Sequence, residues 1–396
     1  MESIRELYRI GHGPSSSHTM GPRNAAEHFF SLYPSAQHYE VSLYGSLAST
    51  GKGHLTDAAI REVFSSHGKE VDIYWYPDEE KAAHPNALVI KEGDGGMEQT
   101  YYSVGGGKIV IEGEVEDPSS HPYPPQFSTM RSILEYCAKE GLQLWEFVLE
   151  CEGNEIIPYI EEVWTVMEEA VARGLCGEGV LPGGLKLARK ASQYWAKAQQ
   201  SMVPTALPLC YALAVSEENA SGAKIVTAPT CGASGVLPGV LHYFASHEKV
   251  AKVKILRALL TAGLIGTLVK SNGSISGAEV GCQGEVGVAC AMAGAAATQL
   301  WGGSIFQIEY AAEMGLEHHL GLTCDPMRGL VQIPCIERNA LAAMRSLDHA
   351  TYALLGDGRH KVSFDSVVNV MMETGQALPS LYRETSKGGL AKIIDT

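Results

Sequence analysis

The sequence has few charged residues, and no apolar stretch in it is long enough to cross a membrane. Charged residues make up 19% of the 396 residues, against roughly a quarter in an average protein. An uncharged apolar stretch of note, Ala258–Val269, is well short of the roughly twenty residues that a transmembrane helix needs. Met1–Arg9 already carries Glu2, Arg5 and Glu6, which is untypical of a signal peptide. These absences predict a cytoplasmic protein with no membrane partner.

Basic residues are also scarce. Lysine and arginine number 30 against 45 aspartates and glutamates, so the net charge is -15. Nucleic acids and anionic membranes attract a basic face, and we expect neither as a partner. The 43 glycines among 396 residues are a larger share of the chain than the usual roughly 7%. A chain low in charge and rich in glycine has little polar surface to spare, and we expect a homo-oligomer, such as a homodimer.

The cysteines do not form an even set of the kind that a disulfide framework requires. Nine is an odd number, and cytoplasmic cysteines are ordinarily reduced. Most buried free cysteines act as small hydrophobic residues, so their sequence context must show whether any of them bind a metal. The nine are Cys137, Cys151, Cys176, Cys210, Cys231, Cys282, Cys290, Cys324 and Cys335.

Alternating apolar and polar residues, which are typical of strands, are confined to the first part of the chain. We expect strands at 39–43, 71–75, 87–90, 101–104 and 108–111. Residues 1–115 thus predict an α/β domain with a small mixed sheet. Four prolines among polar residues mark 116–128 as a linker. From 129 to 396 the apolar period is helical, as in Val163–Val171. The predicted class is α+β, with an all-helical second domain that carries the chemistry.

A serine-rich loop precedes the first predicted helix. Gly11–Thr19 contains Ser15, Ser16, Ser17 and Thr19, flanked by His12 and His18. Hydroxyls and free backbone N–H groups at a helix N-terminus suit a carboxylate or a phosphate. An elaborate N-cap is the alternative, since serine and threonine cap helices routinely.

Two further polar loops are candidate ligand sites. Gly51–Asp57 offers Lys52 and His54 for anion binding or proton transfer, although this stretch alone favours a solvated turn with a helix cap. Thr227–Gly235, which includes Thr230, could hydrogen-bond a small polar ligand. It could equally be a tight connection before a helix that begins near Val236.

Three cysteines lie in unusually polar surroundings. They are Cys282, Cys324 and Cys335, whereas Cys290 lies among small apolar residues. Their spacing matches neither a zinc ribbon nor a ferredoxin. Three thiolates and one open position would nevertheless suit an iron–sulfur cluster with a substrate-accessible iron. Such an iron is a Lewis acid, and beside an anion loop it suggests dehydration of a hydroxy acid.

Long strings along the whole chain carry a family resemblance. Those strings are His12–Gly21, Tyr44–Asp57 (YGSLASTGKGHLTD), His84–Asn86, Tyr102–Gly107, Gly179–Gly183, Glu217–Gly235, Ser274–Cys290 (SISGAEVGCQGEVGVAC), Leu320–Asn339 and Tyr382–Ala391 (YRETSKGGLA). Through them the chain resembles the bacterial single-chain iron–sulfur L-serine dehydratases, or L-serine ammonia-lyases. The resemblance implies a 4Fe–4S cluster on Cys282, Cys324 and Cys335 in place of pyridoxal phosphate, and an N-terminal domain that is partly regulatory.

The residues and the resemblance together predict conversion of L-serine to pyruvate and ammonia. We expect His54 to be the base, with His18 in reserve. Substrate binding is assigned to Ser15, Ser16, Ser17, Thr19, Lys52, Asn219, Thr227 and Thr230. Relatives often end in a cysteine that can reach the cluster, whereas this chain ends in Ile393–Thr396. Cys231 and Arg328 stand where asparagine and glycine are common.

Other readings of the same features stay open. A cysteine desulfidase would use the same fold, because a thiol in place of the hydroxyl would also bind iron. A non-catalytic iron–sulfur sensor or amino-acid sensor would explain the cysteines and the anion loop. A pyridoxal-phosphate lyase with Lys270 as its Schiff base lacks an accompanying phosphate loop in this sequence.

Overall fold

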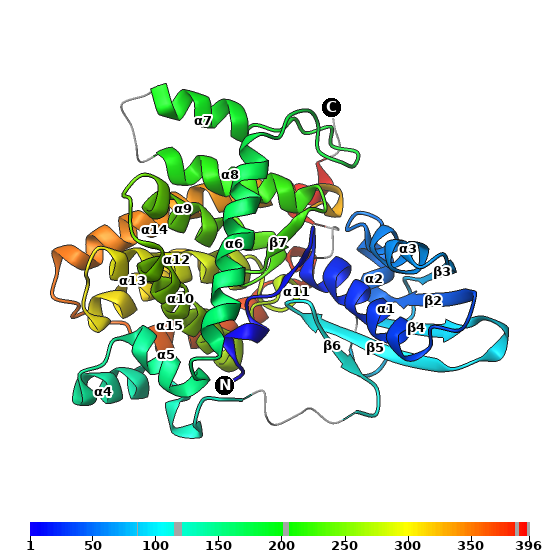
Figure 1. Cartoon of the computed structure of the whole chain (residues 1–396), viewed down its shortest axis with the longest axis horizontal. Coiled ribbons are helices and arrows are strands. Elements are labelled where there is room, and N and C mark those ends of the chain that lie inside the picture. Colours follow the sequence, from blue (N-terminus) through cyan, green and yellow to red (C-terminus); the bar gives the residue numbers. More distant parts are fainter. Residues whose placement is uncertain (85, 115–120, 201–205, 385–387, 394–396) are drawn as a thin grey trace.

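The computed structural model shows a small sheet domain beside a larger body of helices (Figure 1). It describes the whole chain apart from residues 85, 115–120, 201–205, 385–387 and 394–396. The α+β class predicted from the sequence is confirmed. Residues 116–120 of the predicted linker, Pro85 and the last three residues of the chain lie outside the described residues.

The sheet has five strands in the order β3-β2-β4-β5-β6. β2 and β3 are parallel, and the other neighbours are antiparallel. Side chains of β2 alternate between buried and half-buried, because one face packs under helices α1 and α3. The bounds are β2 His38–Tyr44, β3 Glu70–Tyr76, β4 Ala87–Glu92, β5 Glu98–Gly105, β6 Lys108–Ile111, α1 Gly21–Leu32, α2 Gly45–Thr50 and α3 Thr56–Ser66. All five predicted strands are therefore present.

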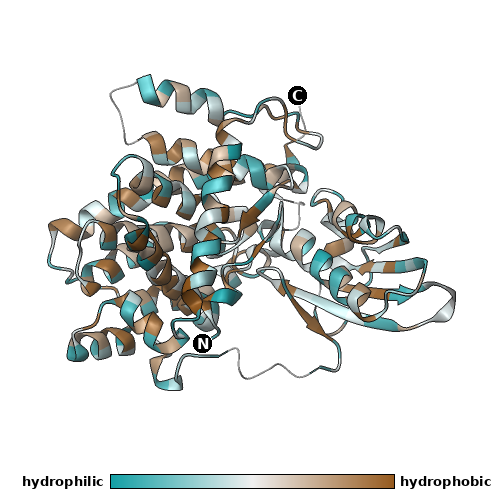
Figure 2. Cartoon of the chain, in the orientation of Figure 1, coloured by the Kyte–Doolittle hydropathy of each residue, from teal (hydrophilic) through white to brown (hydrophobic). Residues whose placement is uncertain are grey.

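Helices make up nearly all of the second part of the chain. The bounds are α4 Met130–Glu140, α5 Leu144–Glu152, α6 Ile156–Leu175, α7 Ala191–Gln200, α8 Leu207–Ala220, α9 Val236–Ser246, α10 Lys252–Asn272, α11 Gly277–Val280, α12 Val288–Leu300, α13 Ile305–Glu317, α14 Cys335–Leu355 and α15 Phe364–Ala377. Apolar residues gather along the inner helices (Figure 2). Among the described residues no helix is both long enough and apolar enough to span a membrane.

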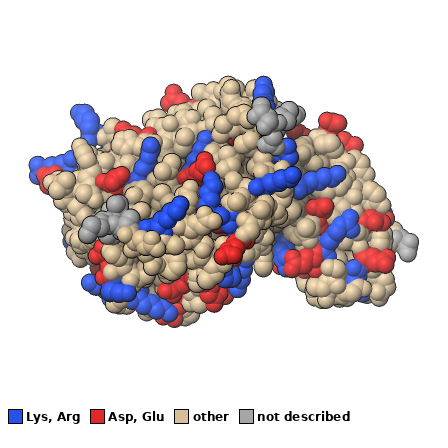
Figure 3. Space-filling model, turned by 90° about the horizontal axis from the view of Figure 1, so that it is seen from above, with Lys and Arg blue, Asp and Glu red and all other residues tan. Residues whose placement is uncertain are grey.

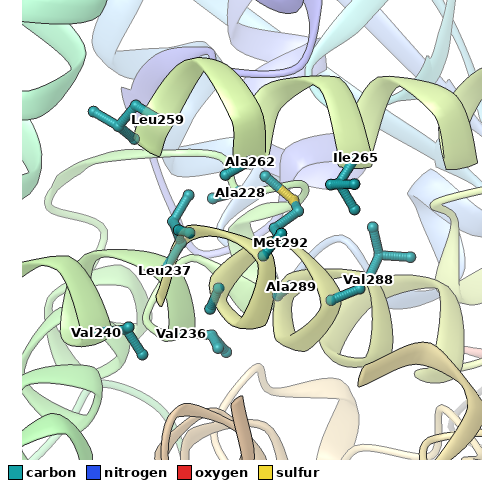
Figure 4. Close-up of a cluster of buried hydrophobic side chains, with 14 of the residues drawn as sticks. Ala228, Val236, Leu237, Val240, Leu259, Ala262, Ile265, Val288, Ala289 and Met292 are labelled. Atoms are coloured by element: carbon teal, nitrogen blue, oxygen red, sulfur yellow. The ribbon is translucent and has the colours of Figure 1, made fainter. Parts of the chain in front are cut away.

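Helix α12 lies at the centre of this body. Its first eleven residues are buried, and Figure 4 shows Ala289 and Met292 between Ile265 of α10 and Leu237 of α9. Small residues let the neighbouring helices approach closely. A Cβ on Gly315 of α13 would lie 2.7 Å from the backbone of Ala291. The glycine and alanine content of these segments is therefore used for helix packing.

The start of the chain packs within the helical body, although it precedes the division predicted at residue 115. Ile4, Leu7 and Tyr8 are buried in the same core as the helices, and the hydroxyl of Tyr8 donates to the carbonyl oxygen of Leu259 at 2.9 Å. Strand β1 (Ile10–His12) pairs antiparallel with β7 (Lys224–Val226). The second part is thus not wholly helical. A strand of three residues is too short to show an alternating pattern in the sequence.

Candidate active site

One pocket lies where the sheet domain meets the helical body. It collects segments that are far apart in the sequence. Its lining residues are Pro14, Ser15, Ser16, Ser17, His54, Gly105, Gly106, Thr230, Gly232, Ile275, Ser276, Gly277, Glu285, Cys324, Pro326, Val331, Cys335 and Glu384. Among these described residues the acids are Glu285 and Glu384, and none is lysine or arginine. On the outer face drawn in Figure 3, by contrast, both signs of charge are interspersed.

The serine loop is held in place from both sides. After β1, the chain enters a single π-helical turn, Ser16–Met20, and Ser15 caps it by accepting from the backbone N–H of His18. The side-chain amide of Asn219 on α8 donates to the carbonyl oxygen of Pro14 at 2.9 Å. A Cβ on Gly13 would lie 2.1 Å from the same amide group, so this close approach requires glycine. The backbone that carries the Ser15–Ser17 hydroxyls is therefore held in position at the pocket wall.

A pair of buried histidines lies under this loop. The ring centroids of His18 and His54 are 4.6 Å apart. The His18 nitrogens pair with the hydroxyls of Ser17 at 2.8 Å and Ser46 at 3.0 Å. Neither ring nitrogen of His54 has a hydrogen-bond partner among the described residues, although its side chain lines the pocket. His54 is thus the imidazole left available for a ligand.

Burial sets the protonation of both histidines. It lowers the pKa of His18 to about 4, with an interaction with Ser46 acting in the opposite direction. Burial, and then the neighbouring His18, hold the pKa of His54 well below its usual range. Removal from water disfavours the charged imidazolium. His54 is therefore neutral at pH 7, which is the form that accepts a proton.

Two threonines fix the backbone around the histidines. The Thr19 hydroxyl donates to the carbonyl oxygen of His54 at 2.6 Å, and the Thr56 hydroxyl donates to that of His18. Between them Leu55 takes a left-handed conformation, with φ 56°, which reverses the chain before α3. Thr56 is thus a cross-link between two loops and not the helix cap that the sequence favoured.

The three cysteines singled out in the sequence come together from three segments. Cys282 precedes α12, Cys324 follows α13, and Cys335 begins α14. Burial raises the pKa of Cys282 to about 11, against the influence of the Arg338 guanidinium. Burial raises the pKa of Cys324, with Glu285 and the other two thiols adding to it, and burial raises the pKa of Cys335, with Cys282 adding to it. The three sulfurs therefore lie within electrostatic reach of one another.

Three thiols are a donor set whose chemistry fits an iron–sulfur cluster. Among the described residues no three His, Cys, Asp or Glu side chains lie close enough to hold one ion. A cluster takes its thiolates on different irons, so its ligands stand further apart. Cys324 and Cys335 line the pocket, whereas Cys290 is buried in α12 with its sulfur 3.5 Å from the carbonyl oxygen of Ala342. The donor set is thus three thiols, two of which lie at the wall of the cavity.

Two acids of the pocket were not predicted from the sequence. Glu285 accepts a hydrogen bond from the Thr230 hydroxyl at 2.8 Å, and burial raises its pKa. Burial and the neighbouring Glu285 raise the pKa of Glu384 to about 8. A single glutamate among the glycines and apolar residues of 284–300 was a signal that could have identified Glu285.

Four of the predicted substrate-binding residues do not line the pocket. The Thr227 hydroxyl donates to the carbonyl oxygen of Leu7 at 2.6 Å. The Thr19 hydroxyl and the Asn219 amide support the loops, as described above. Lys52 is exposed, with its amino group 5.6 Å from the ring of Trp75. The structure gives these residues supporting or surface positions, while Ser15, Ser16, Ser17, Thr230 and His54 face the cavity.

Comparison with known proteins gives matches over almost the whole chain. The family model described as serine dehydratase beta chain matches residues 3–70, and that described as serine dehydratase alpha chain matches residues 70–391. The chain is 42% identical to an L-serine dehydratase of Streptomyces coelicolor, with 98% of each chain covered. It is 40% identical to L-serine dehydratase 1 of Escherichia coli, with 99% of each covered. It is 38% identical to an L-serine dehydratase of Haemophilus influenzae, with 100% of each covered.

Proposed function

The chain belongs to the serine dehydratase family, and from this premise we propose that it is an L-serine ammonia-lyase that converts L-serine to pyruvate and ammonia. The observation that supports this most is the shared cavity. One pocket holds a hydroxyl loop, an unpaired neutral imidazole and two of three clustered thiols. A cytoplasmic location and a homodimer remain predictions from the sequence.

Cys282, Cys324 and Cys335 would hold a 4Fe–4S cluster. Thiolates are the usual ligands of such clusters, and Arg338 beside Cys282 and Cys335 favours their ionised forms. When bound, the cluster supplies a Lewis-acidic iron that assists the departure of a hydroxyl group.

The chain's own residues orient the amino acid. The hydroxyls of Ser15, Ser16 and Ser17 and the N–H groups beside them are donors for the substrate carboxylate. Glu285 and Glu384 also line the pocket and would accept hydrogen bonds from the substrate ammonium group, whose positive charge favours their ionised forms. Hydroxyl donors and carboxylate acceptors in one pocket would select a zwitterion.

His54 then takes the proton from Cα. The Cα–H bond and the Cβ–OH bond break, a Cα–Cβ double bond forms, and the hydroxyl leaves as water with a proton that reaches the pocket from solvent. The proton taken from Cα stays on His54 and must be released to solvent before the next turnover. The resulting aminoacrylate tautomerises and hydrolyses in water to pyruvate and ammonia. A general base in place for such a step contributes about 10²–10⁴-fold to the rate.

His18 is placed to move protons between this cavity and solvent. Ser17 lines the pocket, and Ser46 is partly exposed on the other side of the ring. An imidazole bonded at both nitrogens accepts a proton at one and releases it from the other, as the two hydroxyls rotate. The path Ser17–His18–Ser46 would therefore return the pocket to its starting protonation state after each turnover.

Anaerobic reconstitution of the full chain with iron and sulfide tests the proposal. We expect a brown protein that forms pyruvate and ammonia in equal amounts from L-serine. Comparison of kcat/KM for serine, threonine and cysteine separates this activity from cysteine desulfidation. A reconstituted protein that binds L-serine without releasing ammonia would be a sensor, and the proposal would fail.

A further inference from the structure

A second open pocket lies on the helical body, between α13, the C-terminal half of α14 and the segment before α15, and its volume is about 450 Å³. Figure 1 shows α13 and α14 at the end of the molecule away from the sheet. Its lining residues are Tyr310, Glu313, Met314, Glu317, His318, Asp348, His349, Tyr352, His360, Lys361 and Val362. None of them lines the candidate active site.

Two polar side chains of this pocket are deeply buried and lack a partner. Glu313 is only 2% exposed and His349 only 8%. Glu313 Oε1 and His349 Nε2 have no hydrogen-bond partner among the described residues. Native proteins pair nearly all buried polar atoms, and leaving one unpaired costs free energy. Two such atoms at one cavity indicate that a ligand supplies the missing partner.

The charges and rings around the cavity favour a cationic ligand. Glu317 and Asp348 add two carboxylates. The ring of Tyr310 stacks on that of His360, with centroids 4.2 Å apart, and meets the ring of Tyr352 edge-on at 6.1 Å. Aromatic faces attract cations. Lys361 also lines the pocket, but among the described residues no ion pair joins it to Glu313.

The donor set suits a primary ammonium group better than a metal ion. No three ligating side chains in the described part of the chain lie close enough to hold a metal. Burial lowers the pKa of His349 to about 4, so its ring is neutral at pH 7 and can accept at one nitrogen. An ammonium group has three N–H donors, enough for a carboxylate, an imidazole and a further acceptor at once.

We propose that this pocket binds a primary ammonium group, either the ammonium ion or the amino group of a small metabolite, through Glu313 and His349. The site is independent of the proposed lyase activity. Burial, with Glu317 and Glu309 nearby, raises the pKa of Glu313 to about 8. Its carboxyl therefore holds a proton near neutral pH, and binding of a cation beside it should expel that proton.

Titration calorimetry of the full anaerobic protein at pH 7 tests this site. The probes are ammonium chloride and methylammonium chloride, with potassium chloride and tetramethylammonium chloride as controls at equal ionic strength. We expect both primary ammonium probes to bind and the controls not to. Tighter binding of methylammonium would identify a small amine as the ligand, and tighter binding of ammonium would identify the ion itself. Heats measured in two buffers should differ because a proton is released.

Three variants test whether the measured heat of binding comes from this pocket. Glu313→Gln keeps the shape of the side chain and should weaken binding at least tenfold and abolish proton release. Tyr352→Ala changes a residue that is 62% exposed, so the fold should tolerate it while binding weakens several-fold. Glu373→Gln on α15 makes the same change of charge at an exposed position and should alter nothing. Absence of binding, equal binding of potassium, or unchanged binding in Glu313→Gln would overturn the proposal.

Discussion

Replacement of His54 separates catalysis from folding, because neither of its ring nitrogens has a partner in the described structure. His54→Leu keeps a side chain of similar volume and removes both nitrogens. Exchange of an unpaired buried polar group for an apolar one of similar shape is close to neutral. We therefore expect the free energy of unfolding to change by less than about 1 kcal/mol. Loss of the base should lower kcat by about 10²–10⁴-fold, which corresponds to about 2.7–5.5 kcal/mol.

His18→Leu is the matched control, since it removes a histidine that is fully paired. This change breaks the hydrogen bonds to Ser17 and Ser46. At about 1 kcal/mol for each bond, the variant should lose about 2 kcal/mol of stability. Urea unfolding and anaerobic turnover of L-serine, at matched absorbance of the cluster, give both quantities for both proteins. A His54→Leu variant with near-normal kcat, or one that loses stability as His18→Leu does, would refute the assignment.

The pH dependence supplies an independent check on His54. A base works when it is neutral, so activity is lost as the pH falls through its pKa. An ordinary histidine, with a pKa near 6.5, would be about three-quarters protonated at pH 6. Burial and His18 hold the pKa of His54 well below that value. The acid limb of kcat/KM should therefore lie clearly below pH 6.5, and a limb at 6.5 or above would contradict the structure.

Three further outcomes are expected. Cys282→Ser should lose the brown chromophore after reconstitution, whereas Cys290→Ser should keep it, as judged by visible absorption; equal loss in both would remove the ligand assignment. Ser46→Ala should lower kcat more than KM and enlarge the solvent isotope effect, while Ser49→Ala on the same helix should not; identical behaviour of the two would exclude the relay. Burial alone would raise the pKa of Glu2, but hydrogen bonds from Lys108 and Lys270 bring it to about 2. The stabilisation from this depressed pKa is present above pH 4.5 and fades as the pH falls towards 2. Glu2→Gln should accordingly lower the urea midpoint at pH 7, and the difference should shrink below pH 4.5; a difference independent of pH would contradict this.

Much of the fold could be predicted from the sequence because the buried face of a strand or helix gives its apolar residues a regular spacing. The strands β2–β6 were expected within a few residues of their observed bounds, and Val163–Val171 lies in helix α6, as its apolar period predicts. The pairing of β1 with β7 was not expected. It depends on three residues at each strand, and nothing local marks them as partners.

The sequence predicted which types of residue form the candidate site, but it predicted less well which of them face the ligand. A hydroxyl-rich loop looks the same whether its hydroxyls face a ligand or a backbone carbonyl. Thr230 faces the cavity, whereas the Thr227 hydroxyl bonds to Leu7, more than two hundred positions away in the sequence. Only the tertiary fold decides between these outcomes. Glu285 was missed for a related reason, because a lone glutamate in an apolar segment marks an unusual position without showing that it faces a cavity.

The packing of the first twelve residues against the helical body also constrains how the protein folds during its synthesis. Ile4, Leu7 and Tyr8 leave the ribosome long before the helices that cover them, and β1 waits for β7 to be translated. The serine loop extends from β1 and is held by Asn219, so one of the earliest segments to be synthesised is among the last to take its shape. Long-range contacts of this kind slow folding. Nascent or truncated chains should therefore remain inactive until the centre of the chain has emerged. Until then the apolar residues of the amino terminus stay exposed, and we expect the chain to be most prone to aggregation during its synthesis.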